Sequence, residues 1–168
     1  AENKDKDLAL IKVNGLPKNI KAVNLGSSNE VEIGDDVWAI GHPKSLPWSF
    51  SYGMVSQIRP NYKWTYKDGS NHTATVIQMQ TPISTGNSGG PLFTNEGKVI
   101  GVNTLFQEGG QNLNFAIHIN HVKQFIKDNP DVKNINPIGA AIKKDYPNAK
   151  TQDSNNNGVT DTWYVDTN

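Results

Sequence analysis

The chain has 168 residues, 35% of them hydrophobic, and its 16 basic residues balance its 16 acidic residues. This length is enough for one folded core, and the balanced charge gives no reason to expect nucleic acid as a partner. The sequence has no cysteine and no long apolar run, which excludes disulfides, a thiol nucleophile and a membrane-spanning helix. These features indicate a folded globular domain and leave its activity to be argued from motifs.

Short apolar or alternating segments, separated by turn residues, run through most of the chain. The expected strands are residues 8–13, 37–40, 51–58, 62–66, 73–80, 99–102 and 113–119. Asp68-Gly69, Asn95–Gly97 and Glu108–Gly110 separate neighbouring segments and predict β-hairpins, while Gly53 indicates a bulge or bend inside a strand. Strands at this spacing predict an all-β antiparallel barrel or sandwich.

One helix is expected after the last strand. Asn120 would cap its start, and Asn129-Pro130 would end it. Val122, Phe125 and Ile126 fall on one face at helical spacing, so we expect that face to pack on the barrel.

A glycine-rich turn, Gly86-Asn87-Ser88-Gly89-Gly90-Pro91, places one serine before the apolar pair Leu92-Phe93. A serine hydroxyl becomes a nucleophile when a base takes its proton and backbone N–H groups stabilise the oxyanion of the substrate. Glycines let the backbone bend tightly and leave N–H groups unshielded. The same residue types are common in ordinary hairpin loops, so a structural loop remains the alternative for the turn alone.

The flanking segments strengthen the catalytic interpretation. The turn is followed by Val99-Ile100-Gly101-Val102-Asn103-Thr104 and then by Asn114-Phe115-Ala116-Ile117. In this order the motifs resemble a trypsin-like serine protease of the bacterial HtrA type, over residues 5–127. The resemblance implies a Greek-key antiparallel barrel with a C-terminal helix, a serine endopeptidase that acts through an acyl-enzyme, and an extracytoplasmic location. It also implies peptide or protein substrates and no required cofactor.

The resemblance assigns roles to individual residues. Ser88 matches the nucleophile, and Asp7, which precedes Leu8-Ala9-Leu10, matches the carboxylate that orients the catalytic base. The oxyanion hole falls on the serine turn, at Gly86, Asn87 and Ser88. Asn87 stands where zymogen-activated relatives have Asp, so activation through a salt bridge to a freed N-terminal amine is not expected.

Substrate-binding residues follow from the same resemblance. Residues Ile83, Ser84 and Thr85 would wall the pocket for the side chain that precedes the cleaved bond. No acidic residue lies at the base of this segment, which favours a small or medium apolar side chain over a basic one. The stretch Asn103-Thr104-Leu105 would be the strand edge that pairs with the substrate backbone.

The catalytic histidine of the resemblance should precede Asp7, but no histidine occurs among the first six residues. The four histidines of the chain do not match its position either: His42, His72, His118 and His121. We therefore expect residues 1–16 to be the last strand of an N-terminal barrel and a linker, with the rest of that barrel and the base absent. Residues 17–130 would be the C-terminal barrel.

Two consequences of this incomplete triad stay open. The apolar strand at residues 8–13 must dock elsewhere, exchange between copies or fray, which favours self-association. The alternative function is a catalytically silent barrel that acts as a peptide-binding or structural module.

Residues 131–168 are expected to form an irregular extension. Asp153, Asn155, Asn157 and Asp161 alternate around a glycine at the sixth position, as in a calcium-binding loop. The twelfth position is Tyr164, where a bidentate acid is expected. A flexible polar linker is the equal alternative.

Overall fold

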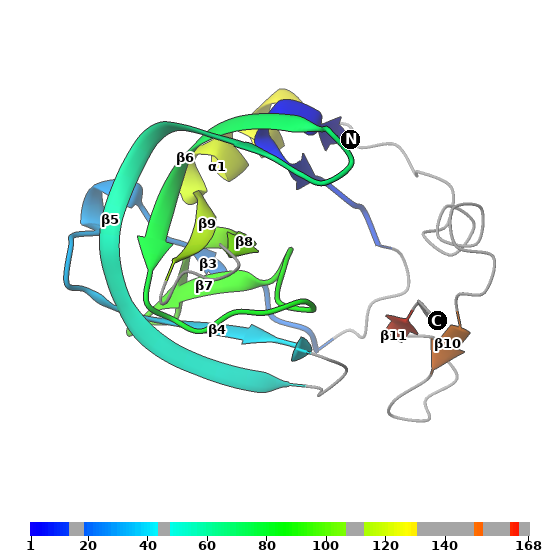
Figure 1. Cartoon of the computed structure of the whole chain (residues 1–168). Helices are drawn as coiled ribbons and strands as arrows, with labels where there is room; N and C mark the ends of the chain where they lie inside the picture. Colours follow the sequence, from blue (N-terminus) through cyan, green and yellow to red (C-terminus); the bar gives the residue numbers. More distant parts are fainter. Residues whose placement is uncertain (14–18, 44–47, 107–112, 131–149, 153–161, 165–168) are drawn as a thin grey trace. The chain divides into compact units, whose positions relative to one another are not determined.

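The computed structural model describes residues 1–13, 19–43, 48–106, 113–130, 150–152 and 162–164. The chain divides into two compact units, residues 1–10 with 16–130, and residues 11–15 with 131–168. The elements of the first unit are β1 (Glu2–Asn3), η1 (Lys4–Lys6), β2 (Leu8–Ala9), β3 (Asn24–Leu25), η2 (Ser28–Glu30), β4 (Asp36–Gly41), β5 (Ser49–Thr65), β6 (Asn71–Met79), β7 (Pro91–Thr94), β8 (Lys98–Phe106), β9 (Asn114–His118) and α1 (Ile119–Asp128) (Figure 1). In the second unit, β10 (Lys150–Gln152) pairs antiparallel with β11 (Thr162–Tyr164).

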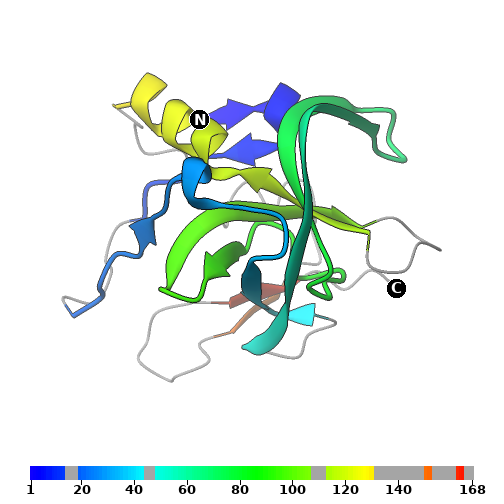
Figure 2. The ribbon, with the colours of Figure 1, turned by 90° about the vertical axis from the view of Figure 1, so that its left-hand side faces the viewer.

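Six strands of the first unit close into an antiparallel barrel. Their order is β8-β7-β4-β5-β6-β9, and a further pairing of β8 with β9 joins the two ends (Figures 1 and 2). β6 and β7 follow each other in the chain but are separated in the sheet by β5 and β4, which gives the barrel its Greek-key connection. The predicted all-β antiparallel barrel is confirmed.

Each of the six barrel strands places at least one apolar side chain in the barrel interior. Fully buried members are Val37, Val55, Ile77, Leu92 and Ile100. Burying a side chain of this kind stabilises a fold by about 1.5–3 kcal/mol relative to leaving it exposed. The rigid interior therefore holds the loops at the barrel ends in place.

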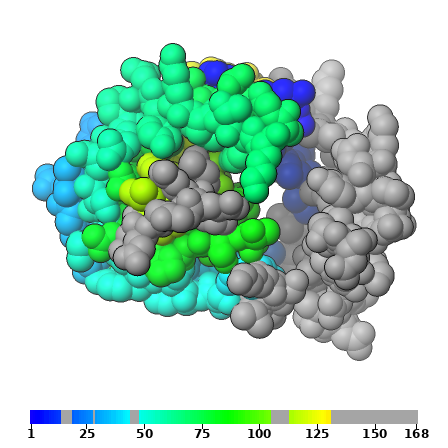
Figure 3. Space-filling view, viewed as in Figure 1, coloured from blue at the N-terminus to red at the C-terminus, as the bar shows by residue number. Residues whose placement is uncertain are grey.

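β5 is one strand of 17 residues, where the sequence predicted two. Figure 3 shows its side chains along the outer edge of the barrel. The pairing with β6 shifts register between Arg59 and Tyr62, and Asn61 has a positive φ of 52°. The break predicted between two strands is thus an irregularity in the pairing of one continuous strand.

Gly53 was expected to mark a bulge or bend, but it pairs regularly with Val37. A Cβ at this position would lie 2.4 Å from the backbone nitrogen of Thr81. Glycine is required here because the chain after β6 passes directly against β5, so this position marks a close backbone approach and the predicted bulge is wrong.

Two of the three predicted hairpins lie in the described part. At Asp68-Gly69, the N–H of Tyr66 donates to Ser70 O, and the N–H of Gly69 donates to Tyr66 O. Gly97 closes the second turn with a φ of 73°. The third turn, at residues 108–110, lies outside the described residues.

The helix begins at Ile119, so the prediction that Asn120 caps it is wrong. β9 runs directly into α1, and the N-cap is the extended residue His118, whose side chain makes no cap hydrogen bond. Phe125 is buried and Val122 half-buried, as expected, whereas Ile126 is 40% exposed and lies outside the packed face. No helix in the described ranges is long and apolar enough to cross a membrane.

The first ten residues pack against the barrel. β1 and β2 form a small antiparallel pair, closed by a hydrogen bond from Leu10 N to Ala1 O. Leu8 is buried in a second apolar cluster with Trp64, Phe115 and Phe125. Both ribbon views place β1, β2 and α1 at the same end of the barrel. The predicted strand at residues 8–13 is therefore shorter than expected and docks on the barrel.

Candidate functional site

The serine turn lies on the connection from β6 to β7, which crosses β5 and β4. Gln80 N donates to Met54 O of β5 at 2.9 Å. Further along, His42 N, just after β4, donates to Gly86 O at 3.1 Å. The turn is therefore held against strand ends on the barrel rather than projecting as a free loop.

Two glycines of the turn have positive φ angles, but only one is confined by its neighbours. Gly86 has a φ of 102°, and a Cβ there would lie 2.1 Å from the carbonyl oxygen of His42. Gly89 has a φ of 81°, and nothing lies within 4 Å of the position a Cβ would take. Gly86 is thus required by both backbone conformation and space, Gly89 by conformation alone.

Ser88 is an exposed residue, which the role of nucleophile would require. Its hydroxyl donates to the carbonyl oxygen of Thr104 at 2.8 Å. Among the described residues, no acceptor takes a hydrogen bond from the backbone N–H of Gly86 or of Ser88. These two N–H groups are therefore available to a substrate oxygen.

Asn87 was expected to contribute to the oxyanion hole, but its backbone N–H donates to Ser84 O at 2.9 Å. This internal bond removes the Asn87 N–H from the predicted donor set, in which Gly86 and Ser88 remain. The Asn87 side chain is only 2% exposed, and its Oδ1 finds no partner in the described structure. In zymogen-activated relatives a freed N-terminal amine forms a salt bridge at this position, whereas the N-terminal amine of Ala1 donates here to Leu10 O.

Asp7 is held by two hydroxyl groups. Its Oδ2 accepts from Thr104 Oγ1 at 2.6 Å and from Tyr66 Oη at 2.9 Å. The Asp7 backbone is left-handed, with a φ of 54°, a conformation that is uncommon outside glycine. Asp7 and Ser88, which are far apart in the sequence, therefore both bond Thr104, one at its hydroxyl and the other at its carbonyl.

No histidine of the chain bonds either residue, and all four histidines belong to the described part. The ring of His42 makes an edge contact with Trp48, and the ring of His72 bonds Lys4 O and Ser70 Oγ. His121 Nε2 accepts from Thr75 N, and His118 is buried at the start of α1. The base that the resemblance requires is not supplied by these side chains.

The residues expected to contact substrate lie on both sides of the serine. Ile83 is half-buried and packs against the barrel core, while Thr85 is exposed. Asn103 was expected to offer a free strand edge, but its N–H donates to Gly90 O and its carbonyl accepts from Gly89 N. These internal bonds remove Asn103 from the predicted edge; Thr104, whose carbonyl accepts from Ser88, and Leu105 follow it in β8.

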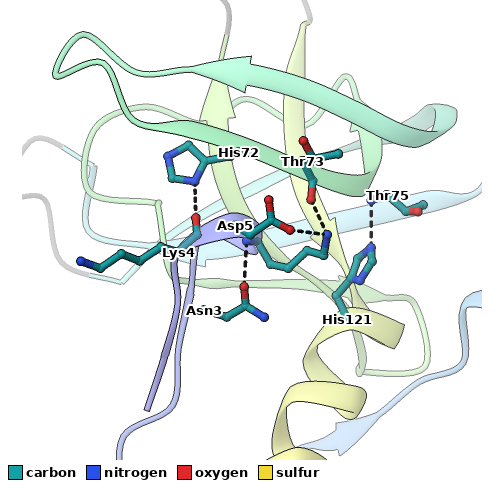
Figure 4. A network of polar contacts seen from close by, with 8 residues as sticks. Asn3, Lys4, Asp5, His72, Thr73, Thr75 and His121 are labelled. Atoms are coloured by element: carbon teal, nitrogen blue, oxygen red, sulfur yellow. Dashed lines mark hydrogen bonds and ion pairs between the residues drawn. The ribbon is translucent and has the colours of Figure 1, made fainter.

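A second polar network fixes residues 3–6, just before Asp7 (Figure 4). Lys6 Nζ donates to Thr73 O at 2.7 Å, and the Lys4 carbonyl lies 2.6 Å from His72 Nδ1. Thr75 N donates to His121 Nε2 at 2.9 Å. We call these contacts the edge network, because β9 pairs with β6 only from Val76 onward, so the preceding part of β6 pairs with β5 on one side and with no described strand on the other.

The two histidines near this network favour the neutral form. Burial lowers the pKa of His121, and the nearby Lys6 ammonium lowers it further, with Asp5 acting in the opposite direction. Burial and the neighbouring His121 lower the pKa of His118. A neutral His121 ring is required for Nε2 to accept from Thr75, so the pKa shift and the hydrogen bond agree.

The predicted calcium ligands, Asp153, Asn155, Asn157 and Asp161, lie outside the described residues. β10 and β11 on either side of them pair with each other, with Gln152 opposite Thr162. Within the described ranges, no group of three or more histidine and acidic side chains is arranged to hold a metal. Calcium binding stays a prediction, checked by protection of residues 150–166 from proteolysis on addition of Ca²⁺.

A closed six-stranded antiparallel barrel, with an exposed serine on a glycine turn, defines the class as a trypsin-like barrel. The family model described as trypsin-like peptidase domain matches residues 1–102. The chain belongs to the trypsin-like peptidase family, in its HtrA-type branch.

Known proteins similar to the chain include proteases. It is 38% identical over 126 residues to the magnetosome formation protease MamE of Paramagnetospirillum magneticum, covering 73% of the chain and 16% of that protein. It is 40% identical over 114 residues to a probable periplasmic serine endoprotease, DegP-like, of Ectopseudomonas mendocina, covering 66% and 22%. The solved structure of the HtrA-type protease AlgW with tripeptide has a TM-score of 0.64 and 31% identity, covering 76% of this chain and 41% of that one.

The chain thus spans about a quarter or less of the length of these curated relatives.

The structure also adds residues that the sequence did not single out. Tyr66 on Asp7, and Lys6 and His121 on β6, come from segments distant in the chain, and no local motif marks them.

Proposed function

We propose that the chain carries the nucleophile and the orienting carboxylate of a serine endopeptidase. The observation that carries the proposal is the convergence on Thr104, whose carbonyl bonds Ser88 and whose hydroxyl bonds Asp7. In a serine triad, the nucleophile and the carboxylate act on the two nitrogens of one imidazole, so they must lie near each other. The convergence fits this requirement.

One oxygen of the Asp7 carboxylate is open to an imidazole. Both hydroxyls bond Oδ2, and no described residue donates to Oδ1. An imidazole N–H that donates to Oδ1 would have its second nitrogen free to take a proton. Since none of the four histidines takes this place, we propose that the imidazole comes from outside these 168 residues.

With that base in place, Ser88 Oγ attacks the carbonyl carbon of the substrate while its proton passes to the imidazole. The N–H groups of Gly86 and Ser88 then hydrogen-bond the oxygen that becomes negative. The proton goes to the leaving amine as the C–N bond breaks, and water hydrolyses the ester on Ser88.

We propose peptides or proteins as substrates, with a small or medium apolar side chain before the cleaved bond. The half-buried Ile83 supports an apolar wall, and the end of β8 from Thr104 to Phe106 is the proposed edge for strand addition, once Ser88 releases the Thr104 carbonyl. The relatives described as periplasmic endoproteases support an extracytoplasmic location. The HtrA-type structure with tripeptide supports a peptide ligand.

A catalytically silent, peptide-binding barrel is the second candidate. It is favoured by one observation: the Ser88 proton is held by Thr104 O and no histidine of the chain reaches it. Under this alternative, Ser88 stays a protonated alcohol whatever base is added.

The two candidates are separated by labelling the 168-residue chain with a fluorophosphonate in phosphate buffer, with and without imidazole. Labelling of Ser88 is followed by intact mass and peptide mapping. We expect slow labelling in phosphate alone and an acceleration on the order of tenfold or more with imidazole, because a positioned base is restored. Asp7→Asn should remove the acceleration, and Ser88→Ala should remove all labelling. Labelling that does not respond to imidazole would favour the silent barrel.

A further inference from the structure

Tyr66 takes part in a closed triangle of oxygen atoms. Its hydroxyl lies 2.9 Å from Asp7 Oδ2 and 2.9 Å from Thr104 Oγ1, and Thr104 Oγ1 lies 2.6 Å from the same Oδ2. An ionised carboxylate only accepts hydrogen bonds, and each hydroxyl has one proton to give. When both protons point to Oδ2, this oxygen is fully engaged and the other, Oδ1, is not.

The Tyr66 side chain is itself firmly placed. It stands where β5 ends, and its backbone N–H and C=O close the turn with Ser70 and Gly69. Its half-buried ring packs edge-on against His72, with ring centroids 4.9 Å apart. A tyrosine held in this way presents its hydroxyl to Asp7 with little freedom to turn away.

The Tyr66 hydroxyl also keeps its proton. Burial raises the pKa of Tyr66, and the hydrogen bond and charge of Asp7 raise it as well, while the nearby Thr104 hydroxyl acts in the opposite direction. Tyr66 is therefore a hydrogen-bond donor throughout the neutral pH range.

We propose that Tyr66 is a positioning residue for the reaction: together with Thr104 it fixes Oδ2 of Asp7, so that Oδ1 faces the catalytic imidazole. This inference rests on the proposed function. Asp7 has a left-handed backbone, and its side chain would have other rotamers open to it without these two bonds. A carboxylate that turns loses its aim at the imidazole, even though its charge remains.

The chain offers a matched control in Tyr52, whose hydroxyl donates to Asp36 on the exposed outer side of β4 and β5. That hydrogen bond raises the pKa of Tyr52, as does the Asp36 charge. Tyr52→Phe therefore removes the same type of bond, tyrosine to aspartate, at a pair that bonds neither Asp7 nor Ser88.

The test measures imidazole-dependent fluorophosphonate labelling of Ser88 as a function of imidazole concentration. Tyr66→Phe should lower the acceleration about tenfold, which corresponds to one hydrogen bond to a charged group. Tyr52→Phe should leave it unchanged within a factor of about two. Full acceleration in a folded Tyr66→Phe chain would overturn the positioning role. No acceleration in the unsubstituted chain would instead contradict the proposed function.

A second measurement holds even if Tyr66→Phe fails to fold. Tyrosinate absorbance is titrated in Asp7→Asn and in the unsubstituted chain. The pKa of one tyrosine should fall in Asp7→Asn, because the Asp7 charge no longer opposes ionisation of Tyr66. An unchanged titration of all tyrosines would show that Tyr66 does not bond Asp7 in solution, and would overturn the inference.

Discussion

The first ten residues attach to the barrel at two neighbouring places that differ in chemistry. In the edge network, Lys6 and, from α1, His121 bond backbone groups of β6 on the side where β9 does not pair. At Asp7, two hydroxyls bond one carboxylate oxygen. The first arrangement gives hydrogen-bond partners to the backbone at a sheet edge, and the second orients the Asp7 side chain. Stability should depend on the first and Ser88 reactivity on the second.

The largest effect on Ser88 labelling should come from a change in the serine turn, which, like Asp7, we expect to determine the reactivity of Ser88. Gly86→Ala should reduce imidazole-dependent labelling of Ser88 to background, because a Cβ would lie 2.1 Å from His42 O and force the turn to move. Its backbone strain should also cost about 1–3 kcal/mol of unfolding free energy.

Gly89→Ala is the control for backbone strain alone. Its φ is also positive, but nothing lies near the added Cβ. We expect a loss of about 1 kcal/mol and a labelling rate that remains measurable. If the two variants label equally, the contact of Gly86 with His42 does not shape the site.

The next largest effect concerns His121 of the edge network, which should change the free energy of unfolding. His121→Ala leaves the Thr75 N–H without its acceptor and should cost about 1–2 kcal/mol in urea unfolding at neutral pH. Hydrogen exchange of the Thr75 amide should accelerate. Gln124→Ala, on the exposed face of the same helix, removes only an exposed hydrogen bond to Asp128, so it should cost less than about 0.5 kcal/mol and leave the Thr75 exchange unchanged. Labelling of folded His121→Ala should stay near the rate of the unsubstituted chain.

The pKa of His121 also gives a direction for the pH dependence of stability. Its folded pKa lies below its usual value of about 6.5, so the unfolded chain binds the extra proton more readily. The stability it contributes is present above about pH 6.5 and is lost as the pH falls through the folded pKa. Buried His118 acts in the same direction. Urea unfolding from pH 8 to 5 should show this loss, with a flatter profile in His121→Ala; an equal slope would exclude His121 as its source.

The smallest effect should come from Lys6→Met, which removes the bond to Thr73 O and an ion pair with Asp5. The Asp5 side chain of this pair is largely exposed, so the pair contributes little, and we expect a loss of about 1 kcal/mol or less. Lys4→Met is the control, since only the backbone of Lys4 bonds the barrel. A larger loss of Ser88 labelling than of stability in Lys6→Met would break the separation of the two networks.

The sequence predicted those parts of the molecule that depend on local chemistry. The hairpin at Asp68-Gly69 and the glycine turn at Ser88 follow from residues that favour turns, and both are where the sequence places them. The continuous β5 and the helix start at Ile119 were missed, because pairing and packing overrode local breaks and caps. Tyr66 could not be predicted, because its partners are distant in the chain.

The most direct test of a shared site around Thr104 is a crystal structure of the 168-residue chain soaked with imidazole. We expect one imidazole ring to lie within hydrogen-bond distance of both Asp7 Oδ1 and Ser88 Oγ, with the Ser88 hydroxyl turned away from Thr104 O. A structure in which Asp7 and Ser88 face different surfaces, and no ring can bridge them, would contradict the proposed serine endopeptidase site.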